Sequence, residues 1–254
     1  MTKLMGRNNP LVTKEFATTS AAPWLRRGPV LLGSAGALVL LIVLAVTLFR
    51  GTGPGEQTPG PAPETSAAEP VNPQIPEHDP SRQRHPADPD WLTGAPAGLV
   101  WRQVDKIALP FGAADGPRAI DEDAGIATGY SHTPQGAVLA GYQIGNRIAL
   151  GPDYARVVDA QTVFDPAAAA DVKAHRGTPD PSALDGQVHA SAFKVLAYLP
   201  TQATVQYAMP NPMNGTYNSY QFTVVWVDSD WKLVAPNDTA SAKALSSIDG
   251  FTPF

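Results

Sequence analysis

Three histidines in the second half of the chain are the side chains best suited to exchange protons near neutral pH: His132, His175 and His189. Four acidic residues that could act as general bases fall in the same region: Asp159, Asp165, Asp171 and Asp185. No pair among them has a spacing diagnostic of a catalytic site. The chain lacks a Gly-rich phosphate loop, a His-Glu-x-x-His motif and a Gly-x-Ser-x-Gly motif. We therefore predict no catalytic residue and no cofactor site.

Local sequence offers structural roles for several of these side chains. His132 precedes a predicted helix, where side chains more often satisfy backbone groups than perform catalysis. Asp165 stands directly before Pro166 and is better explained as a helix cap. His189 falls among strand residues and could point into the domain. The absence of cysteine excludes thiol catalysis and Cys-based metal sites without arguing against export.

A second group of polar residues resembles a set of metal ligands: His78, Asp79, His85, Asp88 and Asp90. They lie in a proline-rich stretch, where no fold is expected to fix their geometry. We therefore predict no metal site.

The stretch Gly28–Phe49 contains no charged residue, and its 21 residues from Pro29 would form a helix of about 31 Å. That length matches the hydrocarbon core of a bilayer. A cleaved signal peptide has a shorter apolar run and a small-residue cleavage site, whereas Arg50-Gly51-Thr52 follows here. The stretch predicts a single transmembrane helix, with the lipid bilayer as its partner.

Charge predicts the orientation of this helix. Residues 1–27 carry five basic residues and one acidic residue, a net charge of +4, and the remainder of the chain carries −9. Positive residues stay on the cytoplasmic side of a membrane. We therefore expect a single-pass protein of the cell membrane, with residues 1–27 as a cytoplasmic basic tail and an extracytoplasmic C-terminal domain.

Residues 50–90 contain ten prolines among Gly, Glu, Ser, Thr and Ala, with few large apolar side chains. Such a segment buries too little surface to offset its chain entropy. We predict a disordered, Pro-rich linker that holds residues 91–254 away from the membrane.

Residues 91–254 are numerous enough, and rich enough in tryptophan, for one exported globular domain. Leu99–Leu109 predicts a strand that Pro110 ends. Thr133-Pro134, Tyr154–Gln161 and Asp165-Pro166 indicate three helices. Four further strands are predicted at Gln187–Leu199, Gln202–Met209, Tyr217–Val227 and Trp231–Ala235. The fold class is therefore α+β, with about three helices packed on a curved antiparallel sheet. Trp226 and Trp231 flank the last hairpin and are expected on opposite faces.

The stretch Tyr220–Pro236, YQFTVVWVDSDWKLVAP, resembles the closing hairpin of cone-shaped domains of the nuclear-transport-factor-two-like (cystatin-like) class. Such domains recur in the bitopic VirB-type scaffold subunit of type IV secretion and in Gram-positive conjugation machines. The segment Gly129–Ala137 is similar to exported domains of actinobacterial conjugative elements. The resemblance covers residues 99–240 and the order of tail, span, linker and domain.

This resemblance implies two functions. The first is a scaffold or interaction component of a bacterial envelope complex for conjugative, type IV-like secretion, with protein partners in that complex as homo- or hetero-oligomers. The second is a membrane-tethered enzyme or ligand binder, because related cone folds place an Asp or His general base in an apolar pocket. The first is favoured, since no catalytic constellation stands out. Nucleic acid is not an expected partner, because the exported part is acidic and has no basic cluster.

Overall fold

A computed structural model describes residues 74–179, 184, 188–211, 214–235 and 243–254. It contains three helices and antiparallel strands in this part of the chain, so the predicted α+β class is confirmed. The predicted cytoplasmic tail and transmembrane helix lie outside the described residues. None of the helices within the described ranges is long and apolar enough to cross a membrane.

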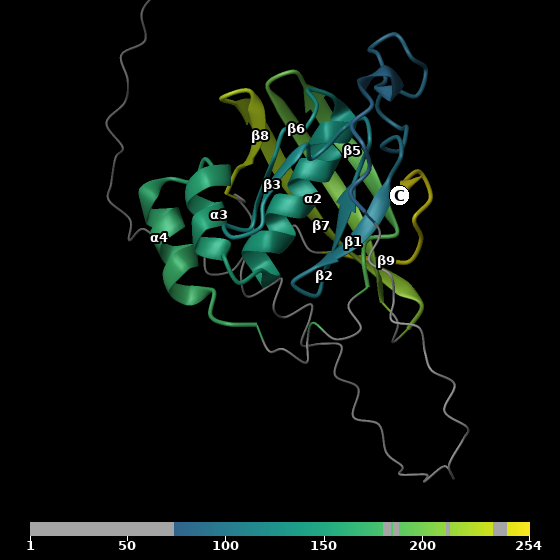
Figure 1. The fold of residues 1–254 in the computed structure, drawn as a ribbon. Coiled ribbons are helices and arrows are strands. Elements are labelled where there is room, and N and C mark those ends of the chain that lie inside the picture. Colours follow the sequence, from purple (N-terminus) through teal and green to yellow (C-terminus); the bar gives the residue numbers. More distant parts are fainter. Residues whose placement is uncertain (1–73, 180–183, 185–187, 212–213, 236–242) are drawn as a thin grey trace, which may run out of the picture. The chain divides into compact units, whose positions relative to one another are not determined.

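The main sheet of the described residues has the strand order β10-β5-β6-β7-β8, with β9 paired to β7 (Figure 1). All of its pairings are antiparallel. Its strands are Ala192–Leu199 (β5), Gln202–Asn211 (β6), Thr216–Val227 (β7), Asp230–Leu233 (β8), Lys243–Leu245 (β9) and Thr252–Pro253 (β10). The predicted meander is thus confirmed, although β5 begins later than expected because Val188–Ser191 form no strand.

The helix α2 (Pro134–Leu150) forms the centre of the domain, and all of its residues are buried. As predicted, Thr133 caps this helix, its hydroxyl accepting the Gly136 N–H at 3.0 Å. The helix lies between the main sheet and β2 (Figure 1). Two shorter helices, α3 (Tyr154–Gln161) and α4 (Pro166–His175), continue the chain close to their predicted positions.

The prediction of one leading strand at Leu99–Leu109 is wrong. This segment forms a hairpin of β1 (Val100–Val104) and β2 (Ile107–Phe111), whose turn places Asp105 and Lys106 at φ 51° and 67°. That left-handed turn usually carries Gly or Asn, so the sequence gives little sign of it. Pro110 does not end the strand but pairs with Trp101 inside the hairpin. A second hairpin joins β3 (Ala119–Asp121) to β4 (Ile126–Thr128).

The predicted linker is too long at its C-terminal end. Residues 74–90 pack on the domain and include a short 3-10 helix, η1 (Pro80–Arg82). Gln83 Nε2 donates to the Ala114 carbonyl at 2.8 Å, and the Arg84 guanidinium pairs with Asp90 at 2.8 Å. Hydrogen bonds to the domain thus fix a stretch whose composition alone predicts disorder. The remainder of the predicted linker lies outside the described residues.

Candidate interaction surface

The two tryptophans of the last hairpin are direct cross-strand partners. Trp226 pairs with Trp231 across a two-residue turn, and their rings make an edge contact at 5.2 Å. The expectation that they face opposite sides is therefore wrong, because cross-strand partners in an antiparallel pair share one face. Trp231 is buried and its Nε1 donates to the Ser131 carbonyl at 2.9 Å, whereas Trp226 is half-buried.

His132 lies flat on the exposed side of this pair. Its ring stacks on Trp226 with centroids 4.0 Å apart and planes 9° from parallel. Its Nε2 is hydrogen-bonded to the Pro200 carbonyl, and its own carbonyl accepts the Tyr198 hydroxyl at 3.2 Å. The start of α2 is thereby joined to the turn between β5 and β6. Stacking and a backbone hydrogen bond, as predicted for a residue at a helix start, account for the position of this imidazole.

The aromatic cluster continues through Tyr198 to Trp91, whose rings meet edge to face at 5.8 Å. Gln135, near the start of α2, donates to the carbonyl of Trp91 at 2.9 Å and so holds that segment in place. Leu92, which directly follows Trp91, is 44% exposed. We call this surface the aromatic end; its members are Trp91, Leu92, His132, Tyr198 and Trp226.

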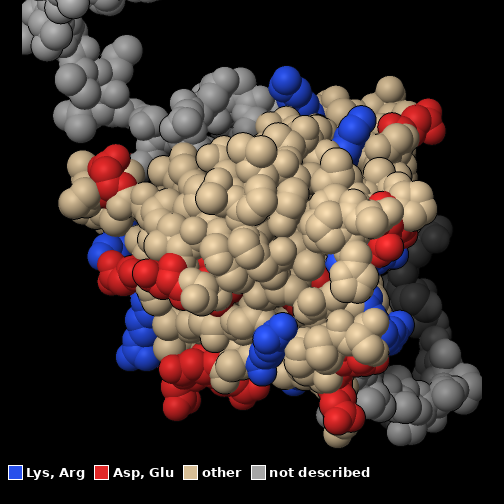
Figure 2. Space-filling view, turned by 90° about the horizontal axis from the view of Figure 1, so that it is seen from above, with Lys and Arg blue, Asp and Glu red and all other residues tan. Residues whose placement is uncertain are grey.

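Charge is distributed around the aromatic end rather than over it. Viewed from above, the end of the domain where α2 begins and the β5–β6 turn lies is broad and uncharged, with Lys, Arg, Asp and Glu gathered toward its margin (Figure 2). Large exposed apolar side chains without charge are typical of protein contact surfaces. The charge distribution therefore favours binding of an uncharged partner here.

Two acidic groups, the half-buried Asp230 and the buried Asp115, hold the loop beneath the aromatic end. The Asp230 carboxylate accepts backbone N–H groups from Gly129 at 2.8 Å, Tyr130 at 3.2 Å and Trp231 at 2.9 Å. Burial nevertheless raises the pKa of Asp230 above its ordinary value, and the hydrogen bonds only partly oppose that shift. The buried Asp115 accepts the hydroxyls of Ser131 and Thr133. These contacts fix the backbone on both sides of His132.

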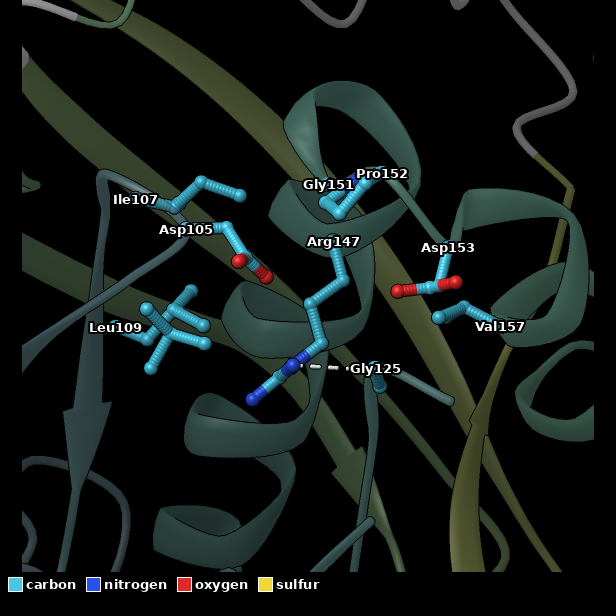
Figure 3. Close-up of a pocket in the computed structure, with 10 residues that line it drawn as sticks. Asp105, Ile107, Leu109, Gly125, Arg147, Gly151, Pro152, Asp153 and Val157 are labelled. Carbon is cyan, nitrogen blue, oxygen red and sulfur yellow. Dashed lines mark hydrogen bonds between the residues drawn. The ribbon is translucent and has the colours of Figure 1, made fainter. Parts of the chain in front are cut away.

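A second feature is a recess beside α2 that Arg147 lines. The buried guanidinium donates to the Gly125 carbonyl at 3.0 Å and to Gln143 Oε1, and burial lowers the pKa of Arg147. Figure 3 shows Asp105 and Asp153 on opposite sides of the Arg147 stem, with the guanidinium turned toward Gly125. The recess measures about 220 Å³ even with the solvent at its mouth included, which is less than pockets for organic ligands enclose. It fits water better than a substrate.

The other predicted candidates lie apart from one another. The exposed His189 stacks on Trp101 at 4.1 Å, and the exposed His175 pairs with Asp171 one helical turn away. Asp159 pairs with Lys173, and Asp165 caps α4 as predicted. Asp185 lies outside the described residues. No catalytic set forms from these side chains within the described ranges.

The stretch that resembled metal ligands makes hydrogen bonds instead. His78 Nδ1 lies 3.1 Å from the Ala113 carbonyl, Asp79 caps η1, and Asp88 accepts the His85 N–H. In the part of the chain that the structure describes, no three His, Asp or Glu side chains converge as metal ligands would.

The sequence alone points to His132 and the two hairpin tryptophans but not to Trp91 and Tyr198. Trp91 is the first residue of the predicted domain, and Tyr198 belongs to a predicted strand with irregular alternation. The short turn at Asp228-Ser229 does indicate that Trp226 and Trp231 share one face, because a two-residue turn makes these tryptophans cross-strand partners.

Comparison with known proteins gives one assignment. No curated protein and no solved structure matches the chain. One family model, described as "Domain of unknown function (DUF8175)", matches residues 64–253, about three quarters of the sequence. The match includes the whole folded domain and begins within the predicted linker. The chain therefore belongs to the DUF8175 family.

Proposed function

We propose that this protein is a membrane-anchored scaffold component of a bacterial envelope complex, of the conjugative, type IV-like secretion class. The aromatic end is the observation that carries the proposal. It exposes Leu92 beside the half-buried Trp91, Tyr198 and Trp226 at one uncharged end of the domain. The predicted transmembrane helix at Gly28–Phe49 would attach this surface to the cell membrane, with the domain on the extracytoplasmic side.

The distribution of ionisable groups supports an interaction role over catalysis. A general base must come within hydrogen-bond reach of its substrate, usually inside a pocket. His175 and His189 are exposed and separate, and His132 is engaged by Trp226 and the Pro200 carbonyl. The Arg147 recess is too small for an organic substrate. The arrangement therefore favours a contact surface.

The proposal can be tested by crosslinking the tagged full-length protein in cells, followed by detergent extraction, affinity purification and mass spectrometry. Other envelope-spanning subunits or an export ATPase should be recovered. The substitution of the exposed Leu92 by serine, Leu92→Ser, should reduce that recovery, because it removes apolar contact area from the aromatic end. The matched control is Ala174→Ser, exposed on α4. Recovery of the protein alone, at the mass of a monomer, would contradict the proposal.

A further inference from the structure

The aromatic end has the chemistry of a surface that binds proline-rich chains. Trp91, Tyr198 and Trp226 are half-buried, so each leaves part of its ring open to a ligand. The indole N–H groups of Trp91 and Trp226 have no acceptor among the described residues, whereas Trp231 Nε1 does. Proline-rich peptides in the polyproline II form dock on aromatic-lined surfaces of this kind, and their free carbonyls accept hydrogen bonds from the edges of the rings.

This chain carries a segment of that composition ten residues before the first described residue. Gln57–Pro63, QTPGPAP, has prolines at positions 59, 61 and 63 and no charged residue. An uncharged segment can cover the uncharged aromatic end without desolvating a charge. Proline also fixes φ near its polyproline II value, so little further entropy is lost on binding.

The connection between that segment and the described domain is short. Residues 78–91 are held along the same end of the domain, since His78 contacts the Ala113 carbonyl and Trp91 contacts Tyr198. Between Pro63 and Gln74, the first described residue, ten residues can span up to about 33 Å. Tethering at this length gives an effective concentration in the millimolar range. A contact too weak to form between separate molecules would then be well populated.

From these observations we propose that Gln57–Pro63 docks on the aromatic end of its own chain. The inference rests on the proposed role of the aromatic end as an interaction surface, and it names a ligand and a regulation for that surface. The docked segment covers the aromatic end and shortens the linker to the membrane. A partner subunit then binds in competition with Gln57–Pro63.

The absence of cysteine makes a direct test possible in the full-length protein. A pair of cysteines, Ala62→Cys with Leu92→Cys, should form an intramolecular disulfide in detergent when an oxidant is added, because the proposal brings these positions together. The control pair is Ala62→Cys with Ala174→Cys, whose second position is exposed on α4 away from the aromatic end (Figure 1). Crosslinking of the first pair should be on the order of tenfold faster, as about 1.4 kcal/mol of docking free energy would produce.

A second variant tests whether proline itself is recognised. Replacing Pro59, Pro61 and Pro63 by Ser leaves the described domain unchanged and should lower the Ala62–Leu92 crosslinking rate to that of the control pair. Equal crosslinking rates for the two original cysteine pairs would overturn the inference. Crosslinked dimers in place of crosslinked monomers would also overturn it, because they would identify a second copy of the chain as the occupant. A chain that crosslinks internally but recovers no partner in cells would sink the proposed scaffold role and leave the docking intact.

Discussion

At the scale of single residues, Asp230 combines burial with three backbone hydrogen bonds. Its folded-state pKa is raised chiefly by burial, and the N–H groups of Gly129, Tyr130 and Trp231 oppose that shift. The folded protein therefore binds the Asp230 proton more tightly than the unfolded chain, whose Asp pKa is about 3.9. By linkage, the stabilisation from this raised pKa is fully present below about pH 3.9 and is lost as the pH rises through the folded-state pKa.

The Asp230→Asn variant tests the direction in which the Asp230 contribution to stability changes with pH. Asn cannot accept from all three N–H groups, so we expect it to lower the free energy of unfolding by about 1–3 kcal/mol. The difference from wild type should narrow as the pH rises from about 3.5 to 7, because only the wild type has the Asp230 carboxyl to titrate. Denaturant unfolding at each pH measures that difference. If the difference in unfolding free energy widened with rising pH instead, the hydrogen bonds would have a larger effect on the Asp230 pKa than burial has.

Gly145 is a residue whose missing side chain allows α2 to approach the sheet. A Cβ at this position would lie 2.5 Å from the Phe222 ring. We expect Gly145→Ala to destabilise the domain by about 1–3 kcal/mol, because overpacking exceeds the gain in helix propensity. Thermal unfolding of Gly145→Ala, Phe222→Leu and the double variant provides the check. The double variant should be more stable than the sum of the single effects predicts; simple additivity would show that the two positions do not clash.

At the scale of elements, local signals predicted the helices and much of the sheet. Thr133-Pro134 and Asp165-Pro166 begin α2 and α4 because a capping side chain followed by proline acts within one helical turn. The β1–β2 hairpin could not be predicted in this way, since its turn at Asp105-Lys106 has no glycine. Residues 74–90 are ordered because they form hydrogen bonds to positions such as Ala114, about thirty residues away in the sequence. The amino-acid composition of the segment does not indicate these long-range hydrogen bonds.

The short strand β10 supplies a further prediction at this scale. It pairs with β5 and brings Phe254 against Trp101 at 5.2 Å and Phe193 at 5.0 Å. Because a two-residue strand contributes few hydrogen bonds, we attribute its attachment mainly to this ring. Phe254→Ala should lower the free energy of unfolding by about 2–4 kcal/mol and raise amide exchange at the start of β5.

The matched control for that prediction is Phe251→Ala. The Phe251 ring makes a longer contact, with the Lys194 ammonium group 5.9 Å from its centroid. Phe251→Ala should lower the free energy of unfolding by about 1 kcal/mol or less and leave amide exchange in β5 unchanged. Equal effects of the two variants would mean that β10 is not held by Phe254.

At the scale of the whole molecule, the aromatic end is a product of topology. Trp91 precedes the first hairpin, His132 precedes α2, and Tyr198 and Trp226 are the second-last residues of β5 and β7. Folding brings together four positions that span more than half of the chain, so no local window of sequence could reveal the surface. The acidic and histidine residues that attract attention in the sequence lie apart in the described structure because each has a different partner, as the pairs Asp171–His175 and Asp159–Lys173 show.

The proposed arrangement of the whole chain also predicts where each end can be labelled. With the basic tail inside and the domain outside, a cysteine introduced at Ala174 should react with a membrane-impermeant maleimide in intact cells. A cysteine at Thr13 should react only after the membrane is permeabilised, and the cysteine-free wild type gives the background. Labelling of Thr13→Cys in intact cells would show that the protein has the opposite orientation in the membrane. The aromatic end would then face the cytoplasm, and its partners would have to be sought there rather than in the envelope.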